Sequence, residues 1–289
     1  MRCNAIARVR LESWTVALAA ALVAVSCSAV GLRPRTEASI VAREFTTTVL
    51  LHGKSLELHV TAPRAPAAAN VVVLYASGDG GWFGAAVDMF RQIGNAGYVA
   101  VGFSSRAFLK IERPRGALVS AAQLAAEYEQ ILVQARRALG LDATSRAVLT
   151  GWSRGGAFSV LVGSEPSAKD HILGVIAIGL AEGEDLEVNS AEDGTDDGQA
   201  SSGARRWPFD TYARIARVAP LPCAVIQATR DNYLPASRAR QLFGPDTPLR
   251  RFYAIEARNH RFSGGKAGFD AALLDALRWI VEQSVRQGA

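Results

Sequence analysis

The sequence predicts the α/β class, with a mostly parallel central sheet and helices on both of its faces. Short apolar runs alternate with longer segments of helical periodicity along most of the chain. Such runs are typical of strands buried on both faces, and their alternation with helices is typical of parallel sheets. The composition agrees, because 49% of the 289 residues are hydrophobic and 20% are charged. This excludes a disordered or collagen-like chain and fits a globular domain with a sizeable core.

The expected elements follow one another in a regular order. Two β-branched segments, 46–51 and 56–60, flank a turn with Gly53 and predict an N-terminal antiparallel hairpin. The buried strands are expected at 71–76, 98–103, 146–151, 173–179, 223–228 and 251–255. The helices are expected at 84–94, 119–138, 155–163, 235–243 and 267–285. Residues 28–42 are polar and predict a tether that precedes one domain at 43–286.

The first 27 residues have the pattern of a bacterial export signal. Three arginines precede a 12-residue apolar run at 14–25, which is too short to span a membrane and has the size of a signal-peptide core. Ala24-Val25-Ser26-Cys27 then resembles a lipoprotein cleavage box, with Cys27 as the lipidated residue. Ordinary cleavage near Ala29 and an uncleaved anchor are the alternatives. The segment predicts a protein of the bacterial cell envelope, either free in the periplasm or anchored on the periplasmic side of a membrane.

Charge and cysteine content exclude several other classes of function. The formal net charge is +5, of which three arginines and Glu12 in the leader contribute +2, so +3 remains. That is too little to indicate a nucleic-acid-binding protein. Cys223 is the one cysteine after the leader, which excludes an internal disulfide and a cysteine zinc site there. Its apolar surroundings predict a buried core residue, and no metal ion or cofactor is expected.

One stretch breaks the alternation of strands and helices. Residues 182–197 contain eight acidic residues and no basic one, and a segment rich in glycine and serine continues to 203. This composition predicts a solvated insertion at 182–203. A lid or a partner-binding segment is the alternative, and the spacing does not match a calcium loop.

A candidate nucleophile lies where an expected strand meets an expected helix. The sequence Gly151-Trp152-Ser153-Arg154-Gly155 has the pattern Gly-x-Ser-x-Gly, in the strand-to-helix context that this motif requires. Both glycines are expected because strand and helix approach closely at such a strained turn. The N–H of Arg154, at the start of the helix, can then stabilise a negatively charged oxygen.

A serine hydroxyl needs a base, and His260 is the expected one. It follows the last expected strand, and catalytic groups of such sheets lie in loops at the carboxyl ends of strands. The other histidines are expected to have surface or structural roles: His52, His59 and His171.

Asp231 is the expected partner of the base, since it too follows a strand. Asp246, in a Pro-rich turn, and the more remote Asp210 are its rivals. The resulting order Ser153, Asp231, His260 is that of the α/β-hydrolase fold and differs from the order in other serine triads.

The loop Ser77-Gly78-Asp79-Gly80-Gly81-Trp82 follows the strand at 71–76 and is expected to supply a second N–H donor. It matches neither a phosphate-binding P-loop nor a dinucleotide fingerprint. The candidate donors are the N–H groups of Asp79 and Gly80, between which the sequence does not decide. The alternative is an ordinary tight turn in which Trp82 covers the core.

Three motifs together resemble the VirJ/AcvB family of bacterial virulence proteins over roughly residues 70–285. They are the SGDGGW loop, the serine motif and Asn259-His260-Arg261-Phe262-Ser263-Gly264-Gly265. The resemblance implies a periplasmic serine hydrolase with an α/β-hydrolase fold, a catalytic triad of Ser153, Asp231 and His260, and an oxyanion hole completed by the SGDGGW loop. Some members are implicated in removing amino acids from aminoacylated phosphatidylglycerol, so an aminoacyl-lipid ester is the implied substrate.

Basic residues near the expected site fit an anionic lipid head group. Arg106, Lys110, Arg113 and Arg115 cluster after the fourth strand, and Arg154 flanks the candidate nucleophile. Of these, Arg113 and Arg115, together with Trp82, are the candidate substrate-binding residues; solvated loop charges are the alternative. The sequence thus predicts an exported serine ester hydrolase. A general carboxylesterase or dienelactone-hydrolase-like enzyme and a non-catalytic envelope interaction protein are the alternatives.

Overall fold

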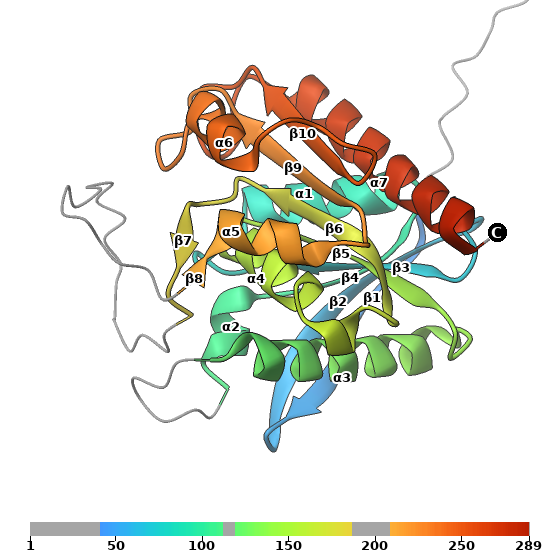
Figure 1. The fold of residues 1–289 in the computed structure, drawn as a ribbon. Helices are drawn as coiled ribbons and strands as arrows, with labels where there is room; N and C mark the ends of the chain where they lie inside the picture. The colour runs from blue at the N-terminus through green and yellow to red at the C-terminus, as the bar shows by residue number, and fades with distance from the viewer. Residues whose placement is uncertain (1–40, 112–118, 187–208, 289) are drawn as a thin grey trace, which may run out of the picture. The chain divides into compact units, whose positions relative to one another are not determined.

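An eight-stranded sheet forms the centre of the computed structural model, in the order β1-β2-β4-β3-β5-β6-β9-β10 (Figure 1). The structure describes residues 41–111, 119–186 and 209–288. Strands β1 and β2 form an antiparallel hairpin, β2 is antiparallel to β4, and the remaining pairs are parallel. The strands are β1 Val41–Leu51, β2 Lys54–Pro63, β3 Val71–Ala76, β4 Val99–Phe103, β5 Arg146–Trp152, β6 Ile172–Ile178, β9 Cys223–Ala228 and β10 Arg250–Ile255. The predicted fold class, including the N-terminal hairpin, is confirmed.

Helices cover the sheet on both faces, with α3 and α7 on opposite sides in Figure 1. The α-helices are α1 Ala85–Asn95, α2 Ser105–Leu109, α3 Ala121–Leu139, α4 Arg154–Gly163, α5 Thr211–Ile215, α6 Ala236–Phe243 and α7 Lys266–Gly288. The longest predicted helices have clear end signals. Ser120 and Gln123 form a capping box at the start of α3, and Gly140 ends it with a left-handed φ of 64°. In the described part of the chain, no helix is long and apolar enough to cross a membrane.

The side-chain alternation of the strands builds two separate cores. In β3, Val72 and Leu74 pack into the cluster under α3 and α4, whereas Val73 and Tyr75 pack into the cluster under α1 and α7. All six residues of β3 are therefore buried, which is why the sequence shows a continuous apolar run. Cys223 is buried in the first of these clusters, and burial raises the pKa of its thiol to about 12.

The parallel direction of the central strands brings four loops to one edge of the sheet. The carboxyl ends of β3, β5, β9 and β10 are followed by the SGDGGW loop, Ser153, Asp231 and His260 respectively. Polar groups from distant parts of the sequence therefore meet at this edge.

Candidate active site

Ser153 lies at a sharp turn between β5 and α4. Its φ of 56° and ψ of −118° are strained for a residue with a side chain. The turn is possible because its neighbours are glycines. A Cβ on Gly155 would lie 2.0 Å from the carbonyl oxygen of Ala76, and one on Gly151 would lie 2.3 Å from the carbonyl carbon of Gly155. Strand and helix thus approach more closely than any side chain allows, and the serine is held in the turn between them.

His260 and Asp231 form a buried pair beside this turn. Nδ1 of His260 lies 2.7 Å from Oδ2 of Asp231, and the two residues are 7% and 2% exposed. The other carboxylate oxygen, Oδ1, accepts hydrogen bonds from the backbone N–H groups of Tyr233 at 2.9 Å and Leu234 at 3.4 Å. Since the carboxylate accepts hydrogen bonds, the proton of the neutral imidazole is placed on Nδ1 and Nε2 is left as the basic atom.

Nε2 of His260 is buried and has no hydrogen-bond partner among the described residues. It therefore makes no hydrogen bond to Ser153 Oγ in this structure. Bonds between a catalytic nucleophile and its base are often long without substrate and tighten only in the complex. A buried ring nitrogen without a hydrogen-bond partner is uncommon, and a catalytic role is one of the explanations for it.

Trp152 and Gly179 also lie against His260. The indole N–H of Trp152 donates to the backbone oxygen of His260 at 3.1 Å, and the two ring centroids lie 5.3 Å apart. Gly179 follows β6 with a φ of 58°, and a Cβ there would lie 2.8 Å from Cε1 of His260. The glycine thus makes room for the ring.

The SGDGGW loop lies directly beside the serine. A Cβ on Gly78 would be 3.4 Å from Cβ of Ser153. The carbonyl oxygen of Gly78 accepts from the Ser105 hydroxyl at 2.7 Å and from the Gly81 N–H at 3.1 Å, which fixes the loop.

The loop distinguishes between the two candidate donors. The N–H of Gly80 donates to the side chain of Asp79 at 2.9 Å, so it is already engaged. In the described part of the chain, the N–H of Asp79 has no acceptor, and that of Arg154 is free at the first position of α4. Asp79 and Arg154 therefore fit the role of N–H donors better than Gly80, whose N–H already has an acceptor.

The side chain of Arg154 is engaged by the start of the acidic segment. Its Nε lies 3.1 Å from Oε1 of Glu184, and its NH2 group lies 4.0 Å from Oδ1 of Asp185. Glu184 belongs to β7 Gly183–Glu184, which pairs with β8 Phe209–Asp210, and is 8% exposed. Burial raises the pKa of Glu184 above its ordinary value, and the charge of Arg154 opposes this in part. Glu182, at the start of the predicted solvated insertion, is exposed, but Gly183, Glu184 and Leu186 are buried, so the expectation is wrong for these three residues. Residues 187–203 lie outside the described part of the chain.

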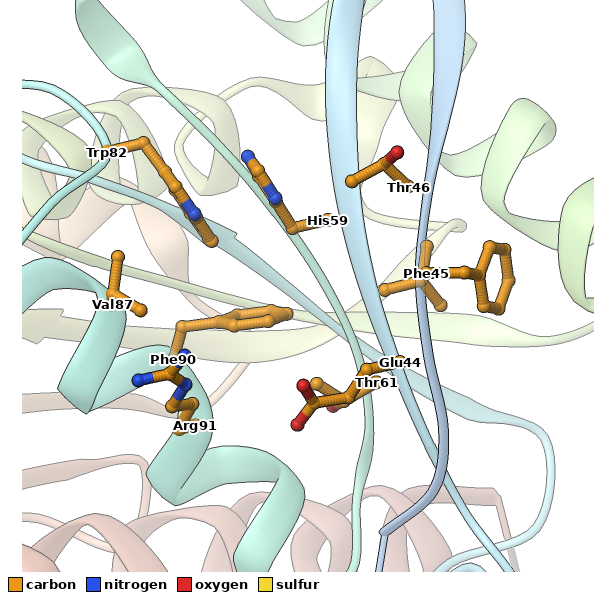
Figure 2. Close-up of a pocket in the computed structure, with 10 residues that line it drawn as sticks. Glu44, Phe45, Thr46, His59, Thr61, Trp82, Val87, Phe90 and Arg91 are labelled. Carbon is orange, nitrogen blue, oxygen red and sulfur yellow. The ribbon is translucent and has the colours of Figure 1, made fainter.

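Trp82 lines a pocket of about 270 Å³ between α1 and the hairpin (Figure 2). Its ring stacks on His59 with a centroid distance of 4.2 Å and an angle of 2°, and it packs edge-on against Phe90. Neither Ser153 nor His260 lines this pocket. The structure therefore does not place Trp82 with the candidate catalytic groups and agrees better with its alternative role as a residue that covers the core.

The basic cluster is only partly in the described structure. Arg106 lies in α2 and Lys110 caps it, so the loop expected after the fourth strand contains a short helix. Arg113 and Arg115, the candidate head-group ligands, lie outside the described residues, as do Cys27 and the rest of the leader.

The rival acids and bases have other partners. Asp246 pairs with Arg240, and Asp210 caps α5 by accepting from the Ala213 N–H at 2.9 Å. The three remaining histidines each lie near a glutamate: His52 with Glu127 at 2.6 Å, His59 with Glu57 at 3.1 Å and His171 with Glu129 at 3.4 Å. Among the described residues, no group of three or more His, Cys, Asp or Glu side chains is arranged to hold a metal ion.

Sequence reasoning missed Gln227, which is fully buried at the end of β9. Its Nε2 donates to Oδ2 of Asp231 at 3.1 Å and to the backbone oxygen of Leu234 at 2.7 Å. A glutamine four residues before a candidate acid, within an apolar strand, was the available signal. Gln227 fixes the carboxylate and the loop that follows it.

Comparisons with known proteins agree with the fold. No protein-family model and no curated protein matches the chain. Among solved structures, it is similar to an esterase from Pyrococcus furiosus (TM-score 0.57, 11% identity, 82% of this chain and 91% of that chain covered). It is also similar to a dienelactone hydrolase from Anabaena variabilis (0.52, 16%, 83% and 97%) and to an α/β serine hydrolase homologue from Coxiella burnetii (0.53, 13%, 82% and 97%). At such identities the likeness shows the α/β-hydrolase fold.

Proposed function

We propose that this protein is an exported serine hydrolase that cleaves a carboxylic ester. The observation that carries the proposal is the buried Asp231–His260 pair, whose unpartnered Nε2 lies at the same sheet edge as the strained Ser153. The structural neighbours named as esterase and dienelactone hydrolase support hydrolysis of an ester in general. The narrower substrate, the aminoacyl ester of aminoacyl-phosphatidylglycerol, is supported by the resemblance of the three motifs to the VirJ/AcvB family.

The proposed reaction has two halves. Oγ of Ser153 attacks the ester carbonyl carbon while Nε2 of His260 accepts the hydroxyl proton, and the N–H groups of Arg154 and Asp79 stabilise the oxyanion. When the tetrahedral intermediate collapses, the bond to the alcohol breaks and the imidazolium gives its proton to the leaving oxygen. Water then attacks the acyl-serine with His260 again as base, which releases the acid and restores Ser153. Asp231 keeps the imidazole oriented and stabilises its positive charge.

The direct test is hydrolysis of p-nitrophenyl butyrate by the wild type and by Ser153→Ala. We expect release of p-nitrophenol by the wild type and almost none by the variant. A fluorophosphonate probe should modify Ser153 in the wild type. Ser55→Ala, at an exposed position near the start of β2, serves as the control and should keep full activity. No hydrolysis of simple esters or of aminoacyl-phosphatidylglycerol, with no labelling of Ser153, would favour the non-catalytic interaction protein.

Export and anchoring are tested by cell fractionation. If Cys27 is lipidated, Cys27→Ser should move the protein from the membrane to the soluble envelope fraction, because the acyl chains provide the anchor. Cys3 lies upstream of the cleavage box, so Cys3→Ser should leave the distribution of the protein between membrane and soluble fractions unchanged. A soluble wild-type protein whose mature chain starts after Ala29 would contradict the anchor and weaken the lipid substrate with it.

Trp152→Phe should lower kcat strongly and the free energy of unfolding only slightly. The substitution keeps an aromatic ring but removes the N–H that donates to the His260 backbone oxygen. We expect kcat to fall roughly tenfold, since small displacements of a base are costly, and the free energy of unfolding to fall by about 1 kcal/mol. Trp279→Phe, a buried tryptophan of α7, is the matched control and should lower stability without a comparable loss of kcat. Equal kcat values for Trp152→Phe and the wild type would contradict this role.

A further inference from the structure

Two exposed aromatic side chains belong to the loops that carry the candidate catalytic groups. Among the described residues, four large hydrophobic side chains are exposed: Leu50, Phe83, Tyr233 and Val285. Leu50 lies in the hairpin and Val285 near the end of α7. Single exposed hydrophobic residues need no explanation. Phe83 and Tyr233 differ from the other two because they adjoin the candidate catalytic groups in the sequence: Phe83 follows the SGDGGW loop, and Tyr233 lies two residues after Asp231.

Tyr233 lies against the candidate base. Its ring meets the His260 ring edge-on, with a centroid distance of 4.7 Å and an angle of 65°, while 56% of the residue stays exposed. Its backbone N–H donates to Oδ1 of Asp231 at 2.9 Å, so the pair that orients the base also fixes this residue. An exposed aromatic residue is thus held beside His260.

Phe83 lies over the loop that carries the candidate N–H donor. It is 64% exposed, and its Cζ is 3.5 Å from the position that a Cβ on Gly80 would take. In the same loop, a Cβ on Gly78 would lie 3.4 Å from Cβ of Ser153. An exposed aromatic residue thus adjoins the glycine loop beside Ser153, as Tyr233 belongs to the loop that carries Asp231.

We propose that Phe83 and Tyr233 contact an apolar chain of the substrate, so that the preferred substrates are esters with a medium or long hydrocarbon chain. The inference rests on the proposed serine hydrolase function. Both residues are more than half exposed, and their aromatic rings are apolar. Each methylene that the substrate buried against them would strengthen binding about fourfold. Binding energy from such a remote chain can also be used to position the ester carbonyl.

The test compares short and long esters of one series. We expect the wild type to show a higher kcat/KM for p-nitrophenyl octanoate than for the acetate, at concentrations below micelle formation. Phe83→Ala and Tyr233→Ala should each lower the octanoate-to-acetate ratio about tenfold, and Tyr233→Phe should restore most of it. Leu50→Ala, the same kind of exposed hydrophobic residue at the hairpin, is the matched control and should keep the wild-type ratio. A second series of alkyl butyrates, from methyl to octyl, shows whether the chain belongs to the acyl or the alcohol part.

The outcomes separate this inference from the proposed function. If Tyr233→Ala lowers kcat/KM equally for acetate and octanoate, the ring positions His260 and does not bind the chain, which overturns its proposed role. Unchanged ratios in both alanine variants, with a wild type that hydrolyses esters and an inactive Ser153→Ala, would overturn the inference and leave the serine hydrolase intact. A wild type without activity on any ester of either series would overturn both. Thermal unfolding of each variant verifies that the compared proteins are folded.

Discussion

His260→Ala should lower kcat for ester hydrolysis by a factor on the order of 10⁴–10⁶, because nucleophile, base and acid act as a unit. Without the imidazole, no other histidine of the described structure can replace it, since the remaining three each lie beside a glutamate. Asp231→Asn should cost somewhat less, because the amide can still contact Nδ1 but can favour the wrong tautomer of the ring.

Two control variants replace an aspartate and a histidine outside the proposed triad. Asp246→Asn removes an exposed aspartate that pairs with Arg240, and it should leave kcat near the wild-type value. His171→Ala removes a half-exposed histidine beside Glu129 and should do the same. Steady-state kinetics on one p-nitrophenyl ester is sufficient to compare all four variants with the wild type. If Asp246→Asn abolished activity and Asp231→Asn did not, the acid would be misassigned and the proposed triad wrong.

The sequence could predict the sheet because burial on two faces leaves a local signal. In β3 every residue is apolar, since alternate side chains enter two different cores. The same logic located the candidate site, because a residue that directly follows a parallel strand must lie at the carboxyl edge. Ser153, Asp231 and His260 come from three such loops, and the structure places Asp231 and His260 in direct contact.

Other features depend on contacts that no local pattern encodes. The helices α2 and α5 have five residues each, too few to show helical periodicity. The arginine beside the nucleophile was expected to be available for an anionic ligand, but a buried glutamate thirty residues further along the chain pairs with it. The position of Trp82 in the loop is compatible with a side chain that faces either the site or the core. Its stacking on His59 of the hairpin shows that it lies against the hairpin. Such side-chain directions are decided by tertiary packing.

Gly155→Ala should destabilise the fold more than any other conservative substitution discussed above, by about 3 kcal/mol or more. The added methyl group would clash with the backbone at the end of β3, at 2.0 Å from the oxygen and 2.6 Å from the carbonyl carbon of Ala76, and at 2.7 Å from the oxygen of Ser77. These atoms cannot rotate away as a side chain can, so α4 must move away from β3, and the turn that holds Ser153 must open with it.

Gly268→Ala is the matched control for this substitution. Gly268 also lies in a helix, α7, but a Cβ there would meet only Cγ2 of Ile255 at 3.5 Å, an ordinary contact. Alanine has the higher helix propensity, so this variant should be unchanged or more stable by up to about 1 kcal/mol. Equilibrium urea unfolding followed by tryptophan fluorescence gives both values, and insoluble expression of Gly155→Ala alone would point the same way. Equal unfolding midpoints for the two variants would mean that strand and helix at the turn can separate without loss. The close approach of α4 and β3 would then not be what keeps Ser153 in its strained conformation.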